Sequence, residues 1–235
     1  MSIPVMGLPL KKLINLGLKV TGSLHYQTSP GELVNDCINR NEGVVTSTGA
    51  LAISTGEFTG RCPKDRYLVR DEISSGSVNW NNYNQPVTED QFNLIFRQVT
   101  DYLNRLPELW VRDSAVCADP KYRLNLRIIA ETPAMSLFAY NMFLRPEEEG
   151  LKADWHILAA PGLKLDTENA GIRQSNAVVI SIKQHMILLA GTGYTGEIKK
   201  SVFSILNYLL PLQKGVLTMH CAANMGKTGD TAIFF

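Results

Sequence analysis

A glycine-rich loop followed by two lysines is the part of the sequence whose residue types point most directly to chemistry. Residues 188–221 are predicted to form a strand, a loop with the pattern G-x-G-x-x-G, a helix and a second strand. Backbone N–H groups at a helix start attract anions, and glycines let a ligand approach the backbone closely. Two adjacent lysines in the first helical turn repel each other unless an anion or the loss of a proton relieves them. The segment therefore predicts an anion-binding site built on Gly191, Gly193, Gly196, Lys199 and Lys200.

The glycine pattern alone also fits a dinucleotide-binding loop, which would make the chain a nicotinamide-dependent oxidoreductase. That motif requires an acidic residue at the end of the following strand, where it binds a ribose hydroxyl. Here this position offers His220 in place of Asp or Glu, and two lysines at the helix start are atypical. A cofactor bound by the 191–196 loop is therefore the alternative hypothesis, beside a tight loop without a ligand.

Two other segments resemble anion sites more weakly. Residues 59–66 contain three cations, Arg61, Lys64 and Arg66, and an arginine fork suits a carboxylate or a phosphate. A solvated basic turn is equally compatible with that segment, and Asp65 is placed to form a local salt bridge with one of its cations. Residues 226–228 read Gly-Lys-Thr like the end of a phosphate-binding loop, but an apolar run follows instead of a helix, which predicts a hairpin turn.

Composition excludes several classes of protein. The 235 residues are 45% hydrophobic and 19% charged with a net charge of +1, which is typical of a globular domain and gives no sign of nucleic-acid or membrane binding. The amino-terminal residues are mildly apolar but interrupted by Lys11 and Lys12, so neither a signal peptide nor a transmembrane span is expected there. The cysteines form no C-x-x-C pair, which argues against a zinc ribbon or a disulfide framework and favours a cytoplasmic location. They are interpreted as small core or loop residues at Cys37, Cys62, Cys117 and Cys221.

The pattern of apolar residues predicts alternating helices and strands. Capping boxes at Ser29/Glu32 and Thr88/Gln91 start two helices, and the apolar residues from Phe92 to Leu106 follow the helical period closely. Strands are expected at 44–45, 51–53, 67–69, 109–111, 124–130 and 155–159, with a hairpin over 177–190, whereas 71–87 is expected to be an exposed connection. These elements predict an α/β (α+β) fold with a mixed β-sheet flanked by helices.

Four blocks in this order resemble one family: EFTGRCPKDRYLV, ADPKYRLNLRII, GTGYTGEIKKSVFSILNYLLP and MHCAANMGKTGDTAIFF. Together they are similar to ATP-dependent phosphoenolpyruvate carboxykinase from about residue 20 to the end. The resemblance implies that residues 1–215 are the amino-terminal, substrate-binding domain and that 216–235 are the first strands of the nucleotide-binding domain. The nucleotide-carrying P-loop of the family would follow Phe235, so the fragment is expected to be inactive alone.

The resemblance implies conversion of oxaloacetate and ATP to phosphoenolpyruvate, CO₂ and ADP in gluconeogenesis, with Mn²⁺ and a nucleotide-bound Mg²⁺. Arg61 matches the substrate-binding arginine, Tyr194 a tyrosine beside the substrate, and Lys199 a cation for the enolate and the transferring phosphoryl group. Lys200 and His220 match two ligands of Mn²⁺. A lysine ligand must be neutral, and burial, the metal and the charge of Lys199 would each lower its pKa.

Further expectations come with the family, together with two departures from it. The resemblance implies a cytoplasmic, monomeric enzyme with small-molecule substrates; a non-catalytic regulatory module is a third hypothesis. Gly193 stands where a bulky aromatic residue is expected, and Cys62 where a serine is usual. Neither position is among the matched functional residues, so the departures concern packing beside the substrate.

Overall fold

The computed structural model describes residues 13–148, 150, 152–216 and 223–233. The chain divides into two compact units, Met1–Ser201 and Val202–Phe235. The boundary expected at residue 215 stays a prediction.

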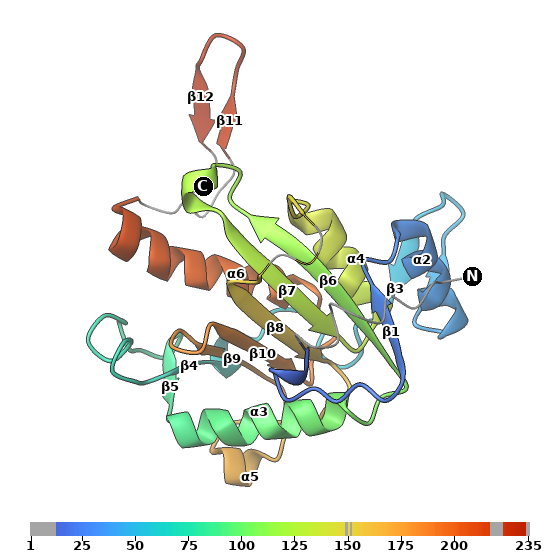
Figure 1. The fold of residues 1–235 in the computed structure, drawn as a ribbon, viewed down its shortest axis with the longest axis horizontal. Helices are drawn as coiled ribbons and strands as arrows, with labels where there is room; N and C mark the ends of the chain where they lie inside the picture. The colour runs from blue at the N-terminus through green and yellow to red at the C-terminus, as the bar shows by residue number, and fades with distance from the viewer. Residues whose placement is uncertain (1–12, 149, 151, 217–222, 234–235) are drawn as a thin grey trace. The chain divides into compact units, whose positions relative to one another are not determined.

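An eight-stranded mixed sheet dominates the first unit, in the order β1-β6-β7-β8-β10-β9-β4-β5 (Figure 1). Neighbours are parallel except in the pairs β6–β7 and β9–β10, which are antiparallel. The strands are β1 (Ser23–Tyr26), β4 (Arg66–Val69), β5 (Gln85–Val87), β6 (Glu108–Val116), β7 (Leu124–Ala130), β8 (Trp155–Ala160), β9 (Ala177–Ser181) and β10 (Met186–Ala190). A separate hairpin pairs β2 (Gly43–Val45) with β3 (Leu51–Ile53). The mixed α/β fold is therefore confirmed.

Helices connect these strands, and α2 and α3 begin at the capping boxes that the sequence predicted, whereas α5 was not predicted. Both capping boxes form, at Ser29/Glu32 before α2 and at Thr88/Gln91 before α3. Thr132 caps α4 in the same way, by accepting the N–H of Met135. The helices are α2 (Pro30–Asn39), α3 (Glu89–Leu103), α4 (Pro133–Met142), α5 (Thr167–Ala170) and α6 (Gly196–Leu209), with short turns at η1 (Pro63–Asp65), η2 (Pro120–Tyr122) and η3 (Leu210–Lys214).

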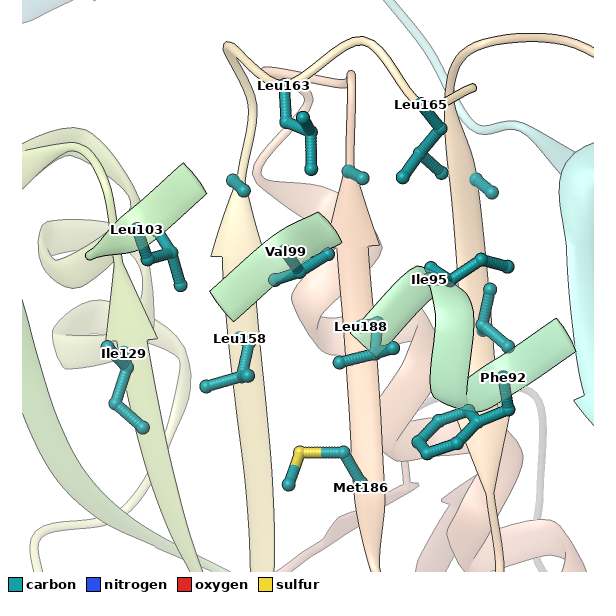
Figure 2. Packing of buried hydrophobic residues seen from close by; sticks show 14 of the residues in the cluster. Phe92, Ile95, Val99, Leu103, Ile129, Leu158, Leu163, Leu165, Met186 and Leu188 are labelled. Carbon is teal, nitrogen blue, oxygen red and sulfur yellow. The ribbon is translucent and has the colours of Figure 1, made fainter. Parts of the chain in front are cut away.

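The main core lies between α3 and one face of the sheet. Four side chains of α3, spaced at three and four residues, point at the strands (Figure 2). They are completely buried: Phe92, Ile95, Val99 and Leu103. Ile129, Leu158 and Leu188 of three adjacent strands form the opposing surface. Packing of α3 against this face holds in place the strands whose ends carry the loops of the candidate site.

Helix α4 covers the other face of the sheet near β6 and β7. Because successive residues of a strand point to opposite faces, Val111 faces α3 whereas Arg112 faces away from it. The Arg112 Nε donates to Ser136 Oγ of α4 at 3.2 Å. Helix α2 packs against α4 on this side. Among the described residues, no helix is long and apolar enough to cross a membrane.

One prediction was wrong and one strand was missed. Residues 85–87, expected to belong to an exposed connection, form β5 at one edge of the sheet. Strand β1, at the other edge, was not predicted at all. In addition, β6 extends well beyond the predicted 109–111. By contrast, the 177–190 hairpin is confirmed, with Ala177 opposite Ala190.

In the second unit, a hairpin pairs β11 (Ala223–Met225) with β12 (Thr231–Ile233). The Gly226 N–H donates to Asp230 O at 2.8 Å, and the Gly229 N–H donates to Gly226 O at 3.1 Å. The Gly-Lys-Thr sequence at 226–228 is therefore a hairpin turn, as predicted, and not the start of a nucleotide-binding helix.

Candidate functional site at the carboxyl end of β10

Strand register brings three loops together at one end of the sheet, the end where β8 and β10 finish. The parallel strands β8 and β10 end side by side, with Ala160 opposite Ala190, and the 191–196 loop follows directly. Strand β9 is antiparallel to β10, so its first residue and the loop before it lie at this same end of the sheet. Strand β4 is parallel to β9 and starts there with Arg66 opposite Val178, which places the 57–65 loop beside them. Ligands of α/β sheets commonly bind outside the carboxyl ends of the strands.

Two of the three glycines of the 191–196 loop are explained by close contacts with the protein backbone, and the third lies beside the Tyr194 ring. Gly191 has φ +71°, and a Cβ there would lie 2.8 Å from Asn176 Cα. A Cβ on Gly193 would lie 2.7 Å from Thr55 O, and one on Gly196 2.6 Å from the Tyr194 ring. In a dinucleotide loop, the glycines make room for a pyrophosphate. Here protein atoms fill that room, so the nicotinamide hypothesis gains no support.

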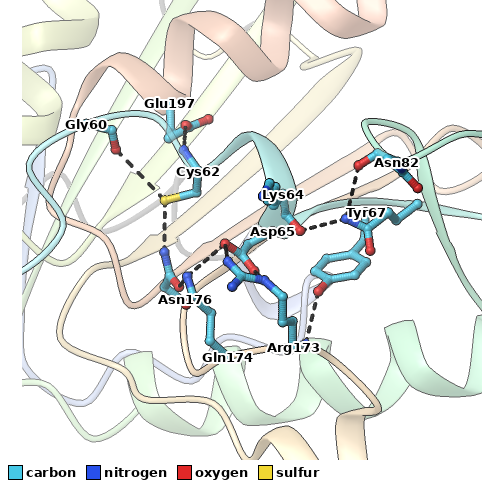
Figure 3. Close-up of polar contacts among 11 residues, drawn as sticks. Gly60, Cys62, Lys64, Asp65, Tyr67, Asn82, Arg173, Gln174, Asn176 and Glu197 are labelled. Carbon is cyan, nitrogen blue, oxygen red and sulfur yellow. Dashed lines mark hydrogen bonds and ion pairs between the residues drawn. The ribbon is translucent and has the colours of Figure 1, made fainter.

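Helix α6 is joined to the 57–65 loop by a buried carboxylate. Glu197 is 0% exposed, and its Oε1 accepts the Cys62 N–H at 2.8 Å. Its Oε2 accepts Arg66 Nη2 at 2.5 Å. Figure 3 shows Glu197 above Cys62, where the loop passes under the start of the helix. The sequence reasoning did not identify Glu197, because nothing local distinguishes it from an ordinary first-turn acid.

A second buried carboxylate anchors the other end of that loop. Asp65 forms a two-pronged ion pair with Arg173, at 2.9 and 2.6 Å, and also accepts Gln174 Nε2 at 2.7 Å (Figure 3). A salt bridge with a cation of its own segment was one expectation for Asp65. It is wrong, because the turn η1 directs the carboxylate inward to a residue 108 positions away.

The Cys62 side chain is held between the same loops. The Asn176 amide donates to Cys62 Sγ at 2.8 Å, and Thr192 also hydrogen-bonds to it. Burial, followed by the negative charge of Glu197, raises the pKa of the Cys62 thiol. Such a thiol is a poor nucleophile. The interpretation of Cys62 as a small packed residue is therefore supported.

The 57–65 loop lines a pocket of about 340 Å³. Three cations line it, Arg61, Lys64 and Arg173. Its lining comprises residues 57–65 together with Arg173 and Gln174. Because Arg61 is exposed while its neighbour Cys62 is buried, the guanidinium is presented to solvent by a fixed backbone.

Lysine and arginine side chains gather where this loop meets the first turn of α6. Burial lowers the pKa of Lys200, and the positive charges of Arg61, Lys199 and Arg66 lower it further. Lys199 is exposed beside it, and the Arg66 Nη1 contacts the Lys200 carbonyl oxygen at 3.4 Å. The cluster is therefore suited to bind an anion, and Lys200 to lose its proton more readily than a surface lysine.

The structure thus brings Arg61, Tyr194, Lys199 and Lys200 to the same end of the sheet, and their functional roles stay a prediction. The fifth predicted residue, His220, lies outside the described residues, as does Cys221. Within the described part of the chain, no three His, Cys, Asp or Glu side chains are placed to hold a metal ion. A lysine binds a metal ion through its neutral amine, and burial together with the neighbouring positive charges lowers the pKa of Lys200.

The sequence profile of the family described as phosphoenolpyruvate carboxykinase matches residues 22–235. Proteins named phosphoenolpyruvate carboxykinase (ATP) from Christiangramia forsetii and Flavobacterium johnsoniae are 48% and 46% identical to it, each over 95% of this chain and 42% of the relative. The protein of that name from Geobacillus kaustophilus is 41% identical over 90% of this chain and 40% of its own length. The chain spans about two fifths of the length of these relatives. It belongs to the ATP-dependent phosphoenolpyruvate carboxykinase family.

Proposed function

We propose that this chain is the amino-terminal, substrate-binding part of an enzyme that converts oxaloacetate and ATP to phosphoenolpyruvate, CO₂ and ADP. The observation that carries the proposal is the cluster of Arg61, Lys199 and Lys200, of which Arg61 also lines the pocket. Oxaloacetate carries two carboxylates, and the reaction creates an enolate and moves a phosphoryl group, so every species except CO₂ is anionic. A fixed group of cations stabilises such charges without having to reorganise during the reaction.

Each cation has a distinct part in the proposal. Arg61, with its planar guanidinium, binds a substrate carboxylate or the departing CO₂. Tyr194 lies beside the substrate. Lys199 stabilises the negative charge of the enolate and of the phosphoryl group during its transfer. Decarboxylation breaks the C–C bond, releases CO₂ and leaves the electron pair in the enolate. The enolate oxygen then attacks the γ-phosphorus of ATP, and the bond from that phosphorus to the β,γ-bridging oxygen breaks to release ADP.

Mn²⁺ is the proposed resident metal, with Mg²⁺ bound to the nucleotide. Lys200 as a neutral amine and His220 as an imidazole would hold the Mn²⁺, together with a residue outside these 235 positions. When bound, the ion supplies Lewis-acid stabilisation to the oxygen that becomes negative. The lowered pKa of Lys200 supports its role, because a protonated amine has no lone pair to donate.

Alanine substitutions at the two proposed ligands test this function in the full-length enzyme that contains this sequence. Lys200→Ala and His220→Ala are expected to abolish Mn²⁺-dependent oxaloacetate decarboxylation. Lys121→Ala, an exposed lysine in η2, is the matched control and should retain activity. Wild-type rates in both ligand variants would reject the assignment.

Several finer points belong to the same proposal. The 235-residue chain alone is expected to be inactive and to bind ATP weakly, so a low-micromolar ATP constant by calorimetry would contradict it. A gluconeogenic role, a cytoplasmic location and a monomeric enzyme are predicted by the family resemblance. No observation favours the nicotinamide hypothesis, for which the test is saturable NADH binding by fluorescence.

A further inference from the structure

Glu197 links the two segments that carry the proposed substrate-binding cations. One segment is the 57–65 loop with Arg61, and the other is the first turn of α6 with Lys199 and Lys200. The Glu197 carboxylate is fully buried and accepts one hydrogen bond from Cys62 and one from Arg66. These partners are 135 and 131 positions away in the sequence. The two segments are therefore held together by one side chain.

The bond to Cys62 acts directly on Arg61. The N–H that Glu197 accepts belongs to the peptide group that joins Arg61 to Cys62. This group is planar, so fixing its N–H also fixes the Arg61 carbonyl and the position of the Arg61 Cα. Arg61 itself is exposed, so the backbone around it sets its position. The bond from Asn176 to Cys62 Sγ and the bond from the Asp65 N–H to Cys62 O constrain the far side of Cys62, whereas the Glu197 bond acts on the peptide group shared with Arg61. The Arg61 backbone therefore depends on Glu197.

The bond to Arg66 adds a second connection. Its guanidinium contacts Glu197 through Nη2 and the Lys200 carbonyl through Nη1, so it touches the first turn of α6 at two points. Charge-assisted bonds of this kind are shorter and about twice as strong as neutral ones. Together the two connections set the separation between the loop cations and the helix cations.

We infer that Glu197 is a positioning residue of this site, which holds Arg61 at the fixed place, relative to Lys199 and Lys200, that substrate binding requires. The inference rests on the proposed function. A buried ion pair that only stabilises the fold is the competing explanation. Asp113 and Arg127 are such a pair, joined by two bonds of 2.7 Å on neighbouring strands. Their register places them at the opposite end of β8 and β10 from the site.

The test compares Glu197→Gln with Asp113→Asn by steady-state kinetics in the full-length enzyme. Glutamine has nearly the size of glutamate, but its NH₂ group is a donor. It would face either the Cys62 N–H or the Arg66 guanidinium, which are donors too, so one of the two hydrogen bonds would be lost. A displacement of about 1 Å in a substrate-positioning group costs up to ~100-fold. Glu197→Gln is therefore expected to raise the KM for oxaloacetate about tenfold or more, with the KM for ATP changed less than about threefold. Asp113→Asn is expected to lower the unfolding temperature without changing either KM.

A double-substitution cycle separates positioning from general damage. If Glu197 acts through Arg61, then Glu197→Gln has little further effect on kcat/KM once Arg61→Ala is present, so the two effects do not multiply. Arg66→Lys is the second variant, for use where Glu197→Gln does not fold. It keeps the positive charge beside Glu197 but cannot reach Glu197 and the Lys200 carbonyl together. The same selective rise in the KM for oxaloacetate is expected, at smaller size.

Each outcome has one meaning. A selective rise in the KM for oxaloacetate and a non-multiplicative cycle support the inference. An unchanged KM, an equal loss for both substrates, or independent effects of Glu197→Gln and Arg61→Ala would overturn it while leaving the proposed function intact. A wild-type enzyme without ATP-dependent oxaloacetate decarboxylation would overturn the proposed function, and the inference with it.

Discussion

Replacement of Gly191 by alanine tests whether the glycine loop is shaped by the protein or by a ligand. Gly191 has φ +71°, where a residue with a Cβ loses about 1–2 kcal/mol. The added Cβ would also lie 2.8 Å from both Asn176 Cα and Ser175 O, which are backbone atoms that cannot move aside cheaply. Such overpacking costs about 1–3 kcal/mol. We therefore expect Gly191→Ala to lower the free energy of unfolding by about 2–5 kcal/mol, without any ligand present.

The assay is urea unfolding of the ligand-free protein, followed by the fluorescence of the buried Trp110 and Trp155. Gly60→Ala is the matched control, since a Cβ there meets nothing within 4 Å and φ is not in the left-handed region. It should change stability by less than about 0.5 kcal/mol. A glycine kept only for a ligand would tolerate alanine in the free protein. Gly191→Ala within about 0.5 kcal/mol of wild type would therefore refute the reasoning.

Three further predictions concern the scaffold. Asp113→Ala should cost about 3–5 kcal/mol in urea unfolding, because it leaves the 1% exposed Arg127 without its counter-charge; a loss below about 1 kcal/mol would contradict this. Burial lowers the pKa of His156 to about 4, so the unfolded chain takes up its proton first. Stability should fall by up to about 3 kcal/mol as the pH drops from about 6.5 to 4; His156→Asn should flatten this part of a pH series, and an unchanged profile would argue against it. Thr88→Ala removes one half of a capping box and should cost about 1 kcal/mol, whereas no change in the urea midpoint would argue that Gln91 alone suffices.

Local signals explain why much of the fold was predictable. The period of Phe92, Ile95 and Val99 reports burial of one face of α3, and the capping boxes report which backbone N–H groups lack partners. The hairpin over 177–190 and the turn at 226–229 likewise depend on residues close in sequence. In each of these cases the physical cause lies within a few residues of its effect, so the sequence contains it.

Edge strands and long-range pairs were not predictable for the opposite reason. Strand β5 contains Pro86, which reads as a loop residue, but a proline is tolerated at the edge of a sheet where its missing N–H has no partner to lose. The partner of Asp65 is Arg173, and the partners of Glu197 are Cys62 and Arg66. Each pair depends on the order of strands, which no local pattern encodes.

The glycine pattern shows how one motif can arise from two different physical causes. In a dinucleotide site, the missing side chains make room for phosphates; here they make room for Thr55, Asn176 and the Tyr194 ring. The same packing bears on position 193, where glycine stands in place of the bulky aromatic residue expected from the family. A larger side chain there would meet the Thr55 carbonyl at 2.7 Å from its Cβ, so the 54–55 segment would have to lie farther away. Glycine at this position is therefore linked to the position of the loop that leads to Arg61, and a substitution at Gly193 should act on the same loop as one at Glu197, from the opposite end.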